Sequence, residues 1–334
     1  MRLALSLLLS LVFSLVVSCS KPTGETEPRA PDERCASGVA PLPGRIQRGI
    51  SVAHSYQHAG TKGYGTETSA ATLRELTELG VEWISLTPFG FMRSLTEPKV
   101  HSIGAYRAGE TDDRMQREIR RAKALGLKVM LKPHIWIVRG LWRGEIELRS
   151  TERRQEQRWR QLVSEVRRRF HGEITYGANW DDAAALPWWD AVDYIGVQFY
   201  PPLATSEKAS SAVIRAEVTA RLDSIGAISR QHEKPVLFTE VGYRAAPNAL
   251  IHPHEWPERT AKPRFDPRAQ AMGYQMLLEA VRHRPWVKGL YWWKWFTDPD
   301  TTEEGPAGFS PRGKLAEAIL RSAYGGNCAA SSVR

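Results

Sequence analysis

The chain has 334 residues and a formal net charge of +9, with 42% hydrophobic, 25% charged and 9% aromatic residues. This composition is typical of a globular protein and excludes a disordered, a collagen-like or a multi-span membrane protein. Three cysteines are too few for a disulfide-rich scaffold or a four-cysteine zinc site. The positive charge is compatible with anionic partners but does not by itself identify a function.

The N-terminus has the pattern of a bacterial secretory signal. Arg2 precedes an apolar run over residues 3–17, which is shorter than the ~20 residues of a permanent transmembrane helix. The segment Val16-Val17-Ser18-Cys19 resembles the lipobox of bacterial lipoproteins, and Ser20 resembles the outer-membrane sorting residue of Gram-negative hosts. The resemblance implies a signal peptide over 1–18, lipid attachment to Cys19, and a location in the bacterial cell envelope at the outer membrane.

Residues 19–45 form a proline-rich tether with too little apolar content for a core. A globular domain is expected over 46–325, with a C-terminal tail over 326–334. Cys35 lies just before the main body of this domain and Cys328 just after it. In an oxidising compartment the two cysteines could pair and clasp the ends of the domain, or they could remain separate thiols at the two termini.

Short β-rich segments alternate with amphipathic helical patterns along the domain. Several of the β-rich segments are nearly continuous apolar runs, as in parallel strands that are covered on both faces. Strands are predicted at 48–54, 82–89, 127–134, 174–179, 194–200, 235–243 and 289–296, and helices at 68–79, 113–125, 152–170, 208–231, 267–283 and 313–323. Repeated β–α units predict an α/β fold of the (β/α)₈ TIM-barrel type, with its site at the C-terminal ends of the strands.

The number of predicted strands is one short of the eight that a TIM barrel needs. One helix takes up half of residues 135–173, and the remaining residues 135–151 show no helical periodicity. A helix, a strand and a second helix do not fit comfortably into this segment. We therefore expect the barrel wall to be incomplete around its fourth strand.

Glu240 is the catalytic candidate that stands out from the residues themselves. It lies in the apolar segment 236–243, where a carboxylate is costly to bury unless it is used or paired. A glutamate at the end of a strand can be the nucleophile of glycoside hydrolysis, in which two carboxyl groups flank the scissile bond. The alternative is a buried ion pair with an arginine or a lysine.

Several segments resemble glycoside hydrolase family 113 in the order in which that family carries them. They are Lys132-Pro133-His134-Ile135-Trp136, Trp142-Arg143-Gly144, Ile174-Thr175-Tyr176-Gly177-Ala178-Asn179-Trp180-Asp181, Asp193-Tyr194-Ile195-Gly196 and Thr239-Glu240-Val241-Gly242-Tyr243. The resemblance covers roughly residues 46–324 and implies a retaining (β/α)₈ glycosidase with β-mannanase activity and no cofactor. It also implies that Glu240 is the nucleophile at the end of the seventh strand.

The sequence departs from this family at the fourth strand, which in the family ends in Gly-Thr-Glu-Leu and carries the general acid/base. Here residues 142–151 run directly into the following helix, and Glu147 aligns with the acid/base, with Glu145 as a weaker substitute. Glu147 could instead be a solvated residue at the start of a helix. By resemblance the sugar site would be lined by His134, Trp136, Asn179, Trp180, Tyr200, Trp292 and Trp293.

We expect retaining hydrolysis of a β-linked, mannan-like oligo- or polysaccharide by a monomer that is attached to the bilayer through its anchor. Glu240 would attack the anomeric carbon, and Glu147 would protonate the leaving oxygen and then activate water. The alternative is a glycan-binding lipoprotein that kept the cleft but lost a competent acid.

A third hypothesis is a metal-dependent hydrolase that uses His54, His58 and His134. His54 and His58 lie on a glycine-rich loop without a set of cysteines or carboxylates beside them, so no metal site is predicted. The arginine-rich helix 152–170 is most simply a solvated outer face. An anionic envelope surface is a conceivable partner for it, and nucleic acid is not expected in this compartment.

Overall fold

The computed structural model describes residues 34–96, 99–102, 110–137, 152–255 and 264–328. All of them belong to one unit, Glu33–Arg334. Its main sheet has seven parallel strands in the order β5-β2-β1-β10-β9-β8-β7. The strands are β1 (Gln47–Ala53), β2 (Trp83–Leu86), β5 (Lys128–Leu131), β7 (Thr175–Asn179), β8 (Tyr194–Phe199), β9 (Val236–Val241) and β10 (Val287–Phe296).

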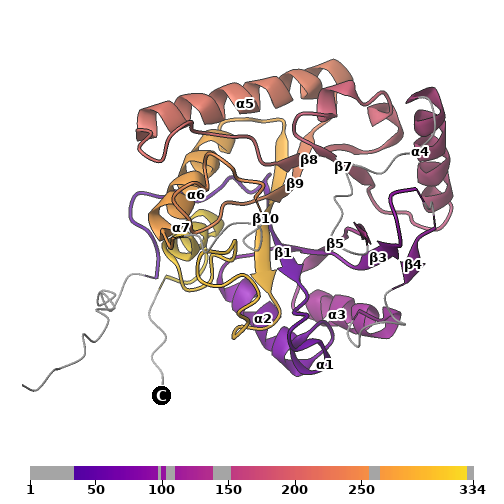
Figure 1. The fold of residues 1–334 in the computed structure, drawn as a ribbon, viewed down its shortest axis with the longest axis horizontal. Helices are drawn as coiled ribbons and strands as arrows, with labels where there is room; N and C mark the ends of the chain where they lie inside the picture. Colours follow the sequence, from indigo (N-terminus) through magenta and orange to yellow (C-terminus); the bar gives the residue numbers. More distant parts are fainter. Residues whose placement is uncertain (1–33, 97–98, 103–109, 138–151, 256–263, 329–334) are drawn as a thin grey trace, which may run out of the picture. The chain divides into compact units, whose positions relative to one another are not determined.

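This sheet is the wall of a TIM barrel that is open on one side. The first strand pairs with the last, β1 with β10, so the sheet curls back on itself as in a barrel (Figure 1). In the part of the chain that the structure describes, β5 and β7 are the two edges, and a complete barrel would hold its fourth strand between them. The expected incomplete wall is therefore confirmed for the described residues.

A second, smaller sheet extends two of the barrel strands beyond the mouth. It has the order β4-β3-β6, with β3 (Phe89–Met92) following β2, β4 (His101–Ser102), and β6 (His134–Ile137) following β5. The sequence patterns at 82–89 and 127–134 each predicted one strand, whereas the structure continues both into this second sheet. It carries Phe89, His134 and Trp136 to the rim of the barrel.

The helices cover the outer face of the main sheet, and four of them begin at side-chain caps. Thr66, Thr111, Ser210 and Asp266 each accept a hydrogen bond from a backbone N–H in the first turn of the helix that follows. The helices are α1 (Ala59–Lys62), α2 (Glu67–Glu78), α3 (Asp112–Ala124), α4 (Glu152–Arg167), α5 (Ser211–His232), α6 (Pro267–Val281) and α7 (Leu315–Tyr324). Within the described ranges, none of these helices is both long and apolar enough to cross a bilayer.

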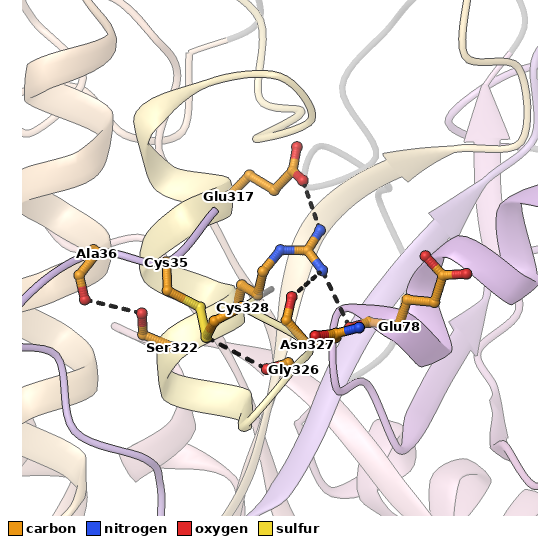
Figure 2. Close-up of a disulfide and its surroundings, with 9 residues drawn as sticks. Cys35, Ala36, Glu78, Glu317, Ser322, Gly326, Asn327 and Cys328 are labelled. Atoms are coloured by element: carbon orange, nitrogen blue, oxygen red, sulfur yellow. Dashed lines mark hydrogen bonds and ion pairs between the residues drawn. A yellow bond between two sulfur atoms is a disulfide. The ribbon is translucent and has the colours of Figure 1, made fainter. Parts of the chain in front are cut away.

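A disulfide between Cys35 and Cys328 joins the two ends of the domain, with 5.4 Å between the Cα atoms (Figure 2). Hydrogen bonds fasten the same ends to the helices beside them. Ser322 Oγ of α7 donates to the carbonyl of Ala36 at 3.0 Å, and the backbone N–H of Asn327 donates to the carbonyl of Glu78 at 3.0 Å. The pairing that the sequence left open is thus present, and it closes a loop that spans almost the whole domain.

Candidate active site

Glu240 lies near the C-terminal end of β9, at the mouth of the barrel, and is only 5% exposed. The pairing of β9 with both of its neighbours shifts register at this point, between Phe238 and Glu240 on the β8 side and between Phe238 and Val241 on the β10 side. An irregularity of this kind re-aims a side chain relative to a regular strand. Here the Glu240 carboxylate meets side chains that come from the ends of three other strands.

Three side chains surround the Glu240 carboxylate. Lys132 Nζ lies 2.5 Å from Oε1, and His134 Nε2 lies 3.1 Å from the same oxygen. The Tyr200 hydroxyl donates a hydrogen bond of 3.3 Å to Oε2. Lys132 directly follows β5, His134 begins β6 and Tyr200 follows β8, so the parallel topology brings these residues together at one end of the sheet.

Burial and ion pairing act in opposite directions on Glu240. Burial alone would raise the pKa of its carboxyl, but the Lys132 ammonium and the His134 ring outweigh it and hold the pKa well below its usual range. Glu240 is therefore ionised at neutral pH. The ion pair that the sequence offered as an alternative to catalysis is present, and it supplies the charge state that a nucleophile needs.

Space for the lysine comes from a glycine on β7. A Cβ atom at Gly177 would lie 3.2 Å from Thr239 Oγ1 and 3.4 Å from Lys132 Cε. A Cβ atom at this position would therefore be tight against Thr239 and would already touch Lys132, which leaves little room for a larger side chain. Lys132 itself is 12% exposed in its side chain.

Aromatic rings form one wall beside the carboxylate. The His134 ring stacks on Trp293 of β10 at 6.0 Å between centroids, and its other neighbour, Phe89, meets it edge-on at 5.3 Å. Trp136 contacts Phe89 at 6.0 Å and is 40% exposed. The rings thus run from the buried carboxylate outward to an exposed tryptophan at the rim.

Three residues that the resemblance placed around the sugar make their contacts elsewhere. Trp292 is fully buried and stacks on Tyr274 of α6 at 3.8 Å, on the helix-covered face of the sheet. Trp180 lies beneath Arg221 of α5, and Asn179 is exposed and donates to Asp182 at 3.3 Å. Trp292 and Trp293 separate because successive residues of a strand point to opposite faces.

Glu110 is a buried carboxyl group that the sequence did not bring to attention. It is 8% exposed and accepts hydrogen bonds from the Tyr56 hydroxyl at 2.9 Å and the Phe89 backbone N–H at 3.3 Å. Burial raises its pKa to about 7. No motif marks Glu110 in the sequence, whereas Lys132 could have been recognised as the first residue of the Lys-Pro-His segment that ends a strand.

Several predicted residues lie outside the described residues, namely Glu147, Glu145 and Cys19. Of the expected carboxyl pair, the structure therefore describes Glu240 and not Glu147. The three histidines of the metal hypothesis make separate contacts: His54 Nδ1 accepts from the Tyr64 backbone N–H, His58 Nδ1 lies 2.8 Å from Asp298 Oδ2, and His134 meets Glu240. Among the described residues, no group of three or more histidine, cysteine, aspartate or glutamate side chains could hold a metal ion.

Comparison with protein families gives one match. The family model described as Glycoside Hydrolase Family 113 matches residues 54–153 and 145–314. The two matched pieces overlap at 145–153, in the part of the sequence between the edge strands β5 and β7. No curated protein is similar enough to this chain to count as a match.

Solved structures with the same fold include two β-mannanases. A structure titled as a complex of a family 113 β-1,4-mannanase is 22% identical, with a TM-score of 0.72 over 84% of this chain and 99% of the other. A family 113 β-mannanase from Alicyclobacillus acidocaldarius, in complex with ManMIm, is 24% identical, with a TM-score of 0.71 over 84% and 97%. A family 5 mannosidase from Rhizomucor miehei is 10% identical, with a TM-score of 0.52 over 89% and 96%.

Proposed function

Because the chain belongs to glycoside hydrolase family 113, and is thus a glycoside hydrolase of the TIM-barrel fold, we propose that it cleaves a β-linked, mannan-like glycan with retention. The observation that carries this proposal is the Glu240 carboxylate, which is buried, ionised and held at the mouth of the barrel. The solved structures support mannan as the substrate, since two of them are titled β-mannanases.

In the first step Glu240 attacks the anomeric carbon. Lys132 and His134 both hold Oε1, whereas Oε2 has the longer contact with Tyr200, so Oε2 is the oxygen that attacks. A bond forms between Oε2 and the anomeric carbon while the bond from that carbon to the glycosidic oxygen breaks. The wall of His134 and Trp293 lies beside the reacting sugar, and Trp136 meets a more distant sugar unit.

Glu147 is the proposed acid/base. Its support is the alignment of Gly144-Glu145-Ile146-Glu147-Leu148 with the family's fourth strand end. In the first step it gives its proton to the leaving oxygen, and in the second it takes a proton from the water that displaces Glu240. Retention requires the two carboxyl groups to be ~5–5.5 Å apart.

We further propose that the protein is lipid-anchored in the bacterial envelope through Cys19. The support is the signal-like N-terminus with its lipobox-like segment. The Cys35–Cys328 disulfide agrees with this location, because disulfides persist in oxidising compartments outside the cytosol.

A second candidate function is glycan binding without turnover. The observation that favours it is that, in the ranges the structure describes, no strand pairs with the outer edges of β5 and β7, because the family's acid/base comes from the strand that belongs there. A protein of this kind would keep the aromatic wall and the charged side chains Lys132 and His134 beside Glu240.

The experiment uses an aryl β-mannoside whose leaving group departs without a proton, with and without azide. We expect release of the aryl group by the wild type, a loss of ~10³-fold or more in Glu240→Gln, and retained first-step release in Glu147→Gln. Azide replaces the activated water, so it should accelerate Glu147→Gln and leave the wild type unchanged. Acceleration of the wild type by azide would mean that Glu147 is misplaced, and no release from any activated β-glycoside would favour the binding protein.

A further inference from the structure

The helix α4 carries an apolar stripe that is partly exposed. Leu162, Val166 and Phe170 follow one another at four-residue spacing and are 48%, 37% and 52% exposed. Phe170 lies just after the end of α4, but its backbone N–H still donates to the carbonyl of Val166 at 2.8 Å, so it continues the helical turn. Residues four apart share one face of a helix, so the three side chains form one strip.

The strip lies on the flank of α4 that faces away from β8. Arg160 and Arg167, on the opposite flank, are bound to Asp190 and Asp193 beside the start of β8. Trp159 lies three residues before Leu162, on the same side of the helix, and packs on Tyr176 of β7 at 4.7 Å between ring centroids. The strip therefore borders the part of α4 that packs on β7, and α4 stands on the side of the sheet away from α6 and α7 (Figure 1).

Positive charge borders this strip. Arg158 lies four residues before Leu162 and Arg169 three residues after Val166, so by helical spacing both are neighbours of the strip. Both are exposed, and within the described residues the ion pairs of this segment involve Arg160 and Arg167 instead. An apolar strip flanked by arginines is the pattern of a helix that lies in the surface of a membrane with anionic lipids.

We propose that the α4 surface, formed by Leu162, Val166 and Phe170 with Arg158 and Arg169, docks on an anionic phospholipid membrane. The apolar side chains enter the boundary between head groups and acyl chains, and the arginines contact lipid phosphates. The proposed anchor keeps a bilayer within reach, because residues 19–35 span at most about 55 Å when fully extended. Such a tether makes a weak contact effective without further affinity.

The first measurement is sedimentation with vesicles. It uses the mature chain, residues 19–334, with Cys19→Ser, so that no lipid is attached and binding depends on the folded domain alone. We expect binding to vesicles of phosphatidylcholine with phosphatidylglycerol, roughly 10-fold weaker binding to phosphatidylcholine alone, and weaker binding at high salt. The combined variant Leu162→Gln, Val166→Gln, Phe170→Gln should lose binding to the anionic vesicles roughly 10-fold.

The matched control replaces two residues of similar exposure on other helices. Val213 of α5 is 54% exposed and Leu315 of α7 is 51% exposed, so Val213→Gln with Leu315→Gln makes a comparable change in surface polarity. This control should bind vesicles like the wild type. Near-ultraviolet circular dichroism of each variant separates a loss of docking from a loss of fold.

The second measurement tests whether the α4 surface enters the membrane. With Cys19→Ser and the Cys35–Cys328 disulfide intact, Phe170→Cys adds a single free thiol for an environment-sensitive dye. Its emission should shift to the blue on anionic vesicles, whereas the same dye at Val213→Cys should not shift. An unchanged emission at position 170, or full binding by the glutamine variant, overturns the proposal.

The chain could instead form a dimer without lipid, and the triple glutamine variant could abolish that dimer. This result would also overturn membrane docking and would assign the α4 surface to a second copy of the chain. Because vesicle binding is measured without any sugar, its outcome is independent of glycosidase activity.

Discussion

The closed and the open side of the barrel differ in how well the sheet is covered. Every residue of β9 is buried, and so is every residue of β10 except Lys288. On the open side, β5 has exposed residues at both ends, and Leu131 is 51% exposed. A barrel strand owes its burial to a neighbour on each side and a helix outside, so one open position in the wall changes the surroundings of both edge strands.

The candidate active site depends on both sides at once. Glu240 comes from the closed side, whereas Lys132 and His134, which hold its charge, come from the strand end at the open edge. The ion pair between Lys132 and Glu240 is therefore a contact across the mouth between the well-covered and the poorly covered part of the wall. Catalysis and the rigidity of the open side should be coupled through it.

The largest effect is expected from breaking that contact. Lys132→Met leaves a buried carboxylate without its main cation, so Glu240 should lose the interaction that lowers its pKa. The acid limb of the kcat/KM profile should then move to higher pH. We expect activity at pH 5 to fall by ~100-fold or more and the protein to lose about 3–5 kcal/mol of stability. Both are measured by pH–rate profiles and chemical denaturation.

The conservative variant is the control for this change. Lys132→Arg keeps the charge, so its acid limb should stay near that of the wild type. If Lys132→Met and Lys132→Arg have the same pH profile, the charge of Lys132 does not hold Glu240 in its ionised state.

The next effect compares the packing of the two sides directly. Trp292→Ala removes a fully buried ring that stacks on Tyr274, and should cost about 3–5 kcal/mol of unfolding free energy. Leu131→Ala, at the open edge, should cost less than about 1 kcal/mol because half of its side chain already meets water. Equal losses in denaturant titrations would show that the open edge is covered in solution.

The Cys35–Cys328 disulfide joins the two ends of the domain. The double variant Cys35→Ser, Cys328→Ser should lose about 2–5 kcal/mol of stability, because the unfolded chain regains the freedom of a very long loop. Differential scanning calorimetry of the double variant and of the oxidised wild type measures this. Reduction of the wild type should reproduce the lowered melting temperature, and a variant that melts with the oxidised protein would contradict the role of the clasp.

Glu110 makes stability depend on pH at the rim of the mouth. Its pKa is raised to about 7, so the folded state binds its proton more tightly than the unfolded state does. That contribution to stability is present below its usual pKa of 4.5 and is lost as the pH rises through about 7. In the wild type, Glu110 should therefore cause a loss of roughly 2–3 kcal/mol of unfolding free energy between pH 5 and pH 8. The Glu110→Gln variant should lack this loss.

Glu240 should change the stability with pH in the opposite direction to Glu110, and the Glu110→Gln variant separates the two contributions. A carboxyl with a lowered pKa contributes stability above the unfolded pKa and loses it only as the pH falls. The loss toward alkaline pH should therefore belong to Glu110, and an unchanged pH profile in Glu110→Gln would assign it to other groups.

Much of the fold follows from local patterns in the sequence. The six predicted helices agree with α2 to α7 within a few residues at nearly every end, because apolar periodicity and capping residues mark them. The incomplete wall was also predictable, since it is a matter of chain length between two recognisable segments. The continuation of β2 and β5 into a second sheet was not predicted, although Pro88 and Pro133 mark the two breaks, because proline cannot donate to a strand ladder.

The sequence by itself predicted that Glu240 lies near the end of a buried strand and that one strand of the barrel is missing from the recognisable pattern, and the described residues agree with both. Both predictions depend on patterns within a few residues. Only the tertiary structure decided which charges meet Glu240. Lys132 lies 108 positions away from it in the chain, and that pairing depends on how the strand ends converge. The structure alone also separated Trp293 from Trp292, because the face of a side chain depends on the register of its strand with its neighbours.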